Sequence, residues 1–139
     1  MTRSSIKKYQ QSSVSNVADA DPHTLISIIF QHIINNNTIA KGAMEREDIE
    51  ARTKAIDKSI ALIGELQDSL DMEQGGEVSQ NLAALYDYCV RRLVESNAKI
   101  EPAMLDEVSK LIAEVKEGWD AIPQEARDQH ATKQAKPED

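Results

Sequence analysis

The stretch that most constrains the fold is residues 77–97, because it carries apolar side chains on two adjoining sides of one helix. The first stripe has the alternating four- and three-residue spacing of a helix face and comprises Val78, Leu82, Leu85, Cys89 and Leu93. The second stripe lies beside it and comprises Tyr86, Val90, Leu93 and Val94. Such a helix is either packed on both sides within the protein, or packed on one side and open to a partner on the other.

The rest of the chain favours a single all-α domain. It has 139 residues, with only 5 glycines and 4 prolines, which is few for a turn-rich β fold. Aromatic residues make up only 4% of the chain, so the core must be built mainly from Leu, Ile, Val and Ala.

The apolar periodicity predicts four helices, over residues 22–41, 47–70, 77–97 and 102–122. Asp21-Pro22 marks a helix start, since Asp is a good N-cap and Pro is tolerated at the first helical position, and Glu101-Pro102 is interpreted in the same way. We therefore expect an antiparallel up-down four-helix bundle over 21–122. An N-terminal arm or short helix over 1–20 precedes it, and a disordered tail over 123–139 follows.

Charge and composition argue against several classes of partner. The net charge of -8 repels phosphate backbones and anionic lipids, so binding to nucleic acid or to a membrane surface is not expected. Membrane insertion is not expected either. The chain has no signal-peptide pattern and no run of about eighteen apolar residues, so a cytoplasmic location is expected. The single cysteine, Cys89, lies on an apolar stripe and is interpreted as a small buried side chain.

No motif predicts catalysis, a cofactor or a metal. The three histidines, His23, His32 and His130, lack the spacing of metal ligands, and the chain has no Glu-x-x-His pair and no Gly-rich phosphate loop. A histidine on a bundle helix could carry a phosphoryl group, but the Lys41-Gly42 pair lies too far from His32 to resemble a phosphotransfer domain. A phosphotransfer-like bundle and a plain scaffold bundle remain the alternative interpretations.

Several short motifs, in the right order along the chain, resemble the flagellin-specific export chaperones (FliS). They are Tyr9 near the start, Asp21-Pro22-His23-Thr24-Leu25-Ile26, Leu66-Gln67-Asp68-Ser69-Leu70-Asp71 with Gly75-Gly76-Glu77, Asn81-Leu82-Ala83-Ala84-Leu85-Tyr86-Asp87-Tyr88 with Arg91-Arg92-Leu93 and Asn97, and Trp119. The chain departs from the family pattern in its first helix. It has Ile29-Phe30-Gln31-His32 where the family often has Leu-Tyr/Phe-Asp-Gly.

The resemblance implies a cytoplasmic chaperone without enzymatic activity. Such a protein binds the disordered carboxy-terminal segment of flagellin, prevents premature polymerisation and delivers the complex to the flagellar type III export gate. It also implies that the amino-terminal arm, with Tyr9 as its anchor, covers part of the site until the client displaces it. We expect a monomer or weak homodimer.

The client-binding residues that we predict are Tyr9, Asn81, Leu82, Leu85, Tyr86 and Arg91. For Leu82 and Leu85, packing in the bundle core is the stronger alternative, because both fit a central stripe. Tyr86 suits a core edge and an interface equally. Asn81 could bond a client backbone or a group within the bundle, and Arg91 could bind a client carboxylate or form a surface salt bridge.

Overall fold

The computed structural model describes residues 21–122 of the chain. The predicted arm over 1–20, which includes Tyr9, and the predicted tail over 123–139 lie outside the described residues. Both therefore stay predictions.

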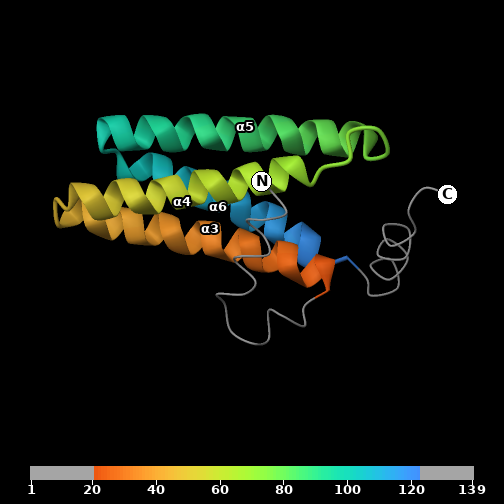
Figure 1. The fold of residues 1–139 in the computed structure, drawn as a ribbon, viewed down its shortest axis with the longest axis horizontal. Coiled ribbons are helices and arrows are strands. Elements are labelled where there is room, and N and C mark those ends of the chain that lie inside the picture. The colour runs from red at the N-terminus through yellow and green to blue at the C-terminus, as the bar shows by residue number, and fades with distance from the viewer. Residues whose placement is uncertain (1–20, 123–139) are drawn as a thin grey trace.

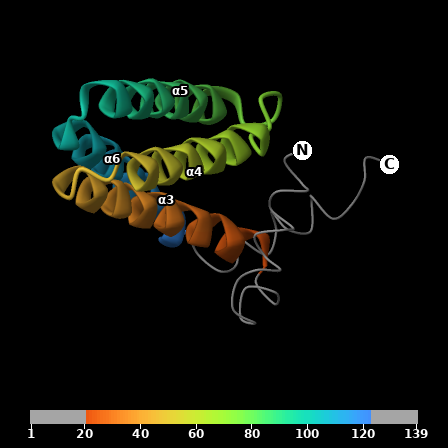
Figure 2. The ribbon, with the colours of Figure 1, turned by 60° about the vertical axis from the view of Figure 1, so that its left-hand side comes forward.

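The described part of the chain forms four α-helices and no strand: α3 (Pro22–Glu45), α4 (Ile49–Asp68), α5 (Gly76–Lys99) and α6 (Pro102–Asp120). Successive helices run in opposite directions and lie side by side (Figures 1 and 2). α3 and α5 sit diagonally across the bundle, and each packs against both α4 and α6. The predicted antiparallel up-down four-helix bundle is confirmed.

The helix starts follow the capping residues of the sequence. The Asp21 side chain accepts a hydrogen bond from the Thr24 backbone nitrogen at 2.7 Å, and Pro22 occupies the first position of α3. Asp48 caps α4 in the same way, accepting from the Ala51 nitrogen at 3.0 Å. Each of these helices therefore has one of its first free backbone N–H groups satisfied.

Every predicted helix bound lies within four residues of the observed one, and two of the differences have a clear local cause. α3 continues past residue 41 to Glu45, because Ala43 and Met44 beyond Gly42 are 0% and 8% exposed. Burying them offsets the propensity cost of a helical glycine, which is about 1 kcal/mol. α4 begins two residues later than the predicted 47, since Glu47 adopts the left-handed conformation, with φ 57°, and Asp48 is the cap.

The turn between α4 and α5 depends on both of its glycines. A Cβ on Gly75 would lie 1.7 Å from the Ser79 hydroxyl and 2.6 Å from the Asp71 carbonyl oxygen, so no other residue fits there without rearrangement. Gly76 has a φ of 55°, a conformation that glycine adopts without strain. The break between the predicted helices over 47–70 and 77–97 is therefore confirmed.

All four helices contribute to one apolar core, which encloses a buried polar link. The Ser59 hydroxyl donates to the Asn37 side-chain oxygen at 2.7 Å, and the Asn37 side-chain nitrogen donates to the Ser109 hydroxyl at 3.0 Å. The link joins α4, α3 and α6. It fixes their relative register, because a slipped helix would leave buried polar groups unsatisfied at about 1–3 kcal/mol each.

The last turn of α6 is fastened to the first turn of α3. The rings of His23 and Trp119 stack with centroids 4.7 Å apart, and the Trp119 indole nitrogen donates to the His23 carbonyl oxygen at 2.8 Å. In return, His23 Nε2 donates to the Trp119 carbonyl oxygen at 2.7 Å. Phe30 meets Trp119 edge-on at 6.5 Å.

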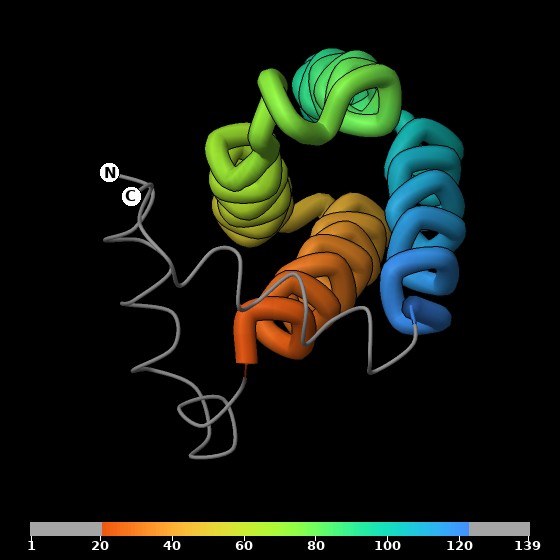
Figure 3. Tube along the Cα trace, turned by 90° about the vertical axis from the view of Figure 1, so that its right-hand side faces the viewer, coloured from red at the N-terminus to blue at the C-terminus, as the bar shows by residue number. Residues whose placement is uncertain are grey.

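Between its start beside α5 and this junction, α6 takes an oblique course. α6 starts beside the end of α5 and finishes beside the start of α3, so α5 and α6 diverge toward the start of α5 (Figures 1, 2 and 3). The two helices are thus close together along only part of their length.

Candidate functional site

The core face of α5 lies between the two apolar stripes of the sequence. Its buried residues are Ser79, Tyr86, Cys89, Leu93 and Ser96. Their spacing of seven, three, four and three places them on one helix face. The outer members of the two stripes are consequently on opposite flanks of α5, where Val78 and Val94 are 67% and 55% exposed.

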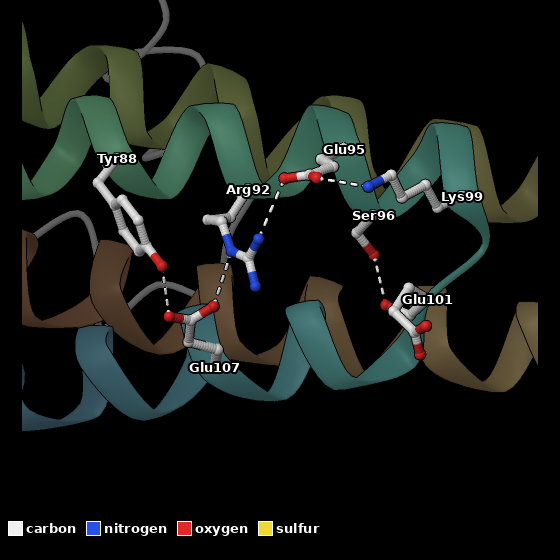
Figure 4. Close-up of polar contacts among 7 residues, drawn as sticks. All are labelled: Tyr88, Arg92, Glu95, Ser96, Lys99, Glu101 and Glu107. Carbon is white, nitrogen blue, oxygen red and sulfur yellow. Dashed lines mark hydrogen bonds and ion pairs between the residues drawn. The ribbon is translucent and has the colours of Figure 1, made fainter.

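One flank of α5 faces α6 along a line that we call the α5–α6 seam. Near the turn that joins the two helices, this seam is polar (Figure 4). The Tyr88 hydroxyl donates to one Glu107 oxygen at 2.5 Å, and Arg92 Nε donates to the other at 2.8 Å. We call these three residues the Glu107 clasp. Close by, the Ser96 hydroxyl donates to the Glu101 carbonyl oxygen at 2.9 Å and ties down the turn itself.

The Glu107 clasp holds its carboxylate in the ionised form. Hydrogen bonds from Tyr88 and Arg92 lower the pKa of Glu107, because both donors stabilise the negative charge. The same hydrogen bonds to Glu107 raise the pKa of Tyr88 and of Arg92. The three groups therefore form one charge-assisted unit across α5 and α6.

Beyond the clasp, toward the start of α5, the seam becomes apolar and less buried. We call this part the open half of the seam, and it comprises the half-buried side chains of Leu82, Leu85, Leu111 and Val115. By contrast, Cys89 and Leu93 on α5 are 0% exposed. The difference follows from the divergence of α6, which leaves these four side chains packed on the core but not covered by the opposite helix.

The structure brings three of the predicted site residues together. Leu82 and Leu85 lie in the open half of the seam, and Asn81 is exposed one helical turn before Leu85. Such a position suits a group that bonds the backbone of a bound segment.

The other predicted residues of α5 lie elsewhere. Tyr86 belongs to the core, where it is 2% exposed and where burial raises its pKa to about 12. Arg91 lies on the flank away from α6, exposed and paired with Asp87 at 3.4 Å. A part for either side chain in binding stays a prediction, and neither belongs to the open half of the seam.

Sequence reasoning missed the α6 side of the site and the Glu107 clasp. Leu111 and Val115 fall on the apolar stripe of α6, so hydropathy alone indicates core packing, but the oblique course of α6 leaves them half-buried. Glu107 is separated from Arg92 by the α5–α6 turn, so no local spacing identified the pair. The spacing of four between Tyr88 and Arg92 was the one available signal.

Within residues 21–122, no group of three or more His, Cys, Asp or Glu side chains is placed to hold a metal ion. In the same range, no helix is long and apolar enough to cross a membrane. Burial raises the pKa of the Cys89 thiol to about 11, which makes it a poor nucleophile at neutral pH. His32 is half-buried, and burial lowers its pKa.

Comparison with known proteins agrees with the resemblance found in the sequence. The family model described as "Flagellar protein FliS" matches residues 5–126. The flagellar secretion chaperone FliSB of Pseudomonas aeruginosa is 48% identical over 118 residues, which cover 84% of this chain and 94% of the relative. The flagellar secretion chaperone FliS of Salmonella typhimurium is 38% identical over 127 residues, covering 90% and 94% of the two chains.

A third relative extends the comparison to another genus. The flagellar secretion chaperone FliS of Vibrio cholerae is 35% identical over 124 residues, covering 88% of this chain and 91% of the relative. The matched region includes all four helices and both sides of the α5–α6 seam. The chain therefore belongs to the FliS family of flagellar secretion chaperones.

Proposed function

We propose that this protein is a cytoplasmic export chaperone for flagellin. It binds the disordered carboxy-terminal segment of flagellin, prevents premature polymerisation and delivers the bound subunit to the flagellar type III export gate. It acts by binding alone, as a monomer or weak homodimer, without catalysis or a cofactor. Membership of a family of flagellar secretion chaperones supports the general role. The open half of the α5–α6 seam is the observation that supports a binding surface.

The physical basis of the proposal is apolar surface next to a preformed core. Leu82, Leu85, Leu111 and Val115 are half-buried on two diverging helices. An amphipathic client helix laid along this line would complete their burial, in the manner of helix-in-groove recognition. Asn81 at the edge would bond a free polar group of the client. Since a disordered client loses conformational entropy as it folds, a long contact is needed for useful affinity.

The amino-terminal arm supplies a proposed control. In this account Tyr9 anchors the arm over part of the binding surface, and the client displaces it. An arm that closes the site lowers the apparent affinity in proportion to the fraction of closed molecules. Deleting residues 1–20 should therefore tighten binding of a client peptide, provided that the deleted chain keeps its helical content.

The proposal is tested by titration calorimetry with a synthetic peptide of the cognate flagellin's carboxy-terminal segment. We expect one-to-one binding with a large negative heat-capacity change, which is the signature of apolar burial coupled to folding. Flagellin that lacks this segment is the control and should not bind. A well-folded bundle that gives no heat with the peptide would overturn the proposal.

A further inference from the structure

The seam contains two glutamates in equivalent positions, only one of which has a partner. Glu114 lies seven residues after Glu107, two turns further along α6, and so faces nearly the same direction. Glu107 is bound by Tyr88 and Arg92 of α5. Glu114 is exposed and makes no hydrogen bond or ion pair with the side chains of residues 21–122.

The sequence of α5 explains the difference. Because α5 and α6 are antiparallel, the residues opposite Glu114 are those seven positions before Arg92 and Tyr88, which are Leu85 and Asn81. Neither carries a positive charge. On α6 itself, Lys110 lies one turn before Glu114, but no ion pair joins them. In the open half of the seam, Glu114 thus occupies a position like that of Glu107 in the clasp. No cation of α5 stands opposite it.

We propose that Glu114 binds a lysine or arginine side chain of the client helix. This inference rests on the proposed function, and it adds the chemistry of the client: apolar residues on one face, with a basic residue beside them. The client's cation would donate a hydrogen bond to the Glu114 carboxylate and balance its charge, as Arg92 does for Glu107. Charge complementarity favours such a client, since the chain has a net charge of -8 and the α5 side of the open half has no cation.

The test compares two glutamates of α6 under the same charge change. Glu114→Gln is the variant, and Glu117→Gln is the matched control, because Glu117 lines the shallow groove between α3 and α6 with Gln31 and Ile34. Both are titrated by calorimetry with the flagellin carboxy-terminal peptide at low and high salt. Both side chains are exposed, so neither change should alter the thermal melt.

We expect Glu114→Gln to weaken binding about fivefold at low salt, as a single rim charge pair does, and to reduce the dependence of affinity on salt. Glu117→Gln should change the affinity less than twofold, an effect of net charge only. As a second arm, Glu114→Arg should weaken binding of the native peptide further than Glu114→Gln does. It should regain affinity with a peptide in which one lysine or arginine is replaced by glutamate.

The outcomes separate the two proposals. Equal effects of the two glutamine variants, or no effect of either, would overturn the role of Glu114 while wild-type binding still supported the chaperone function. Failure of every charge-swapped peptide to recover affinity with Glu114→Arg would do the same. A wild-type chain that binds no peptide would overturn both.

Discussion

Helices α3 and α5 have the same length and the same two neighbours, yet they are held in the bundle in different ways. Each has 24 residues and packs against α4 and α6, on diagonal corners of the bundle (Figure 3). α3 buries large apolar residues such as Ile29, Phe30 and Ile33, and the Asn37 link ties it to both neighbours. α5 buries two serines among its five core residues and meets α6 partly through the half-buried Glu107 clasp.

The two arrangements are linked through α6. Trp119 fastens the end of α6 to His23 at the start of α3, and at that end α6 lies away from the first half of α5. The same course of α6 therefore covers α3 and leaves part of α5 uncovered. A bundle can in this way keep one well-packed helix for stability and one partly uncovered helix for binding.

The largest effect should come from removing an aromatic ring from the sealed side. Phe30 is 1% exposed, so Phe30→Ala should lower the free energy of unfolding by about 3–5 kcal/mol. Leu85→Ala, on the open side, should lower the free energy of unfolding by only about 1 kcal/mol, because the Leu85 side chain is only half-buried in the folded protein. Urea denaturation followed by circular dichroism measures both. Similar losses for the two variants would contradict the contrast between α3 and α5.

A smaller effect is expected from the buried polar link of α3. Asn37→Ala removes the hydrogen bonds to Ser59 and Ser109 and should cost about 2 kcal/mol. The fully buried Ser59 hydroxyl then keeps only its longer contact with the Ile33 carbonyl oxygen, at 3.3 Å. Asn36→Ala is the adjacent control, because Asn36 is half-buried and its side chain donates to the His32 carbonyl oxygen of its own helix. Denaturation midpoints that fall equally for both would mean that the link does not fix the register.

The C-terminal end of α5 offers a gain in stability. Ile100 is 52% exposed and has a φ of 53°, a left-handed conformation that is unfavourable for a β-branched residue. Ile100→Gly should stabilise the fold by about 1 kcal/mol. Lys99→Gly, one residue earlier and still helical, should instead destabilise it by about 1 kcal/mol. Thermal denaturation measures both variants, and a lower midpoint for Ile100→Gly as well as for Lys99→Gly would contradict the prediction.

Most of the fold was predictable from the sequence, because the signals that set it are local. The Asp21-Pro22 and Gly75-Gly76 pairs fix a helix start and a turn through backbone geometry alone. The core face of α5 was harder to assign. Hydropathy marked the stripes with Val78 and Val94, whereas burial selects Ser79 and Ser96, which are small enough for close packing but carry no apolar signal.

The candidate site was only partly predictable, for a different reason. Leu82 and Leu85 fit a core stripe and an interface equally well in the sequence, and their half-burial depends on the direction of α6. That direction goes with contacts between residues far apart in the sequence, such as His23 and Trp119, which are 96 positions apart. The position of Tyr86 in the sequence fits a core residue and an interface residue equally. In the structure Tyr86 is 2% exposed, because α5 is rotated so that this side chain faces the core.

The smallest expected effect concerns the Glu107 clasp, and it depends on pH. Hydrogen bonds hold the pKa of Glu107 below its ordinary value of 4.5. A carboxylate whose pKa is lower in the folded state stabilises the fold above the unfolded pKa, and this contribution is lost as the pH falls through the folded pKa. Glu107→Gln should therefore lower the thermal midpoint slightly at pH 7, and the difference from the wild type should vanish once the pH has fallen below the folded-state pKa of Glu107. A difference that grew on acidification would contradict this assignment.

The central claim is that the open half of the seam, and not exposed apolar surface in general, binds the client. Calorimetric titration of the flagellin carboxy-terminal peptide into Leu85→Ala and Ile39→Ala tests it most directly. Ile39 is a matched control, since it is 54% exposed on α3, away from the seam, and loses the same number of atoms. The account predicts about tenfold weaker binding for Leu85→Ala, in the range of one apolar contact buried at an interface, and unchanged binding for Ile39→Ala. Equal affinities for the two variants, with both chains folded, would contradict it.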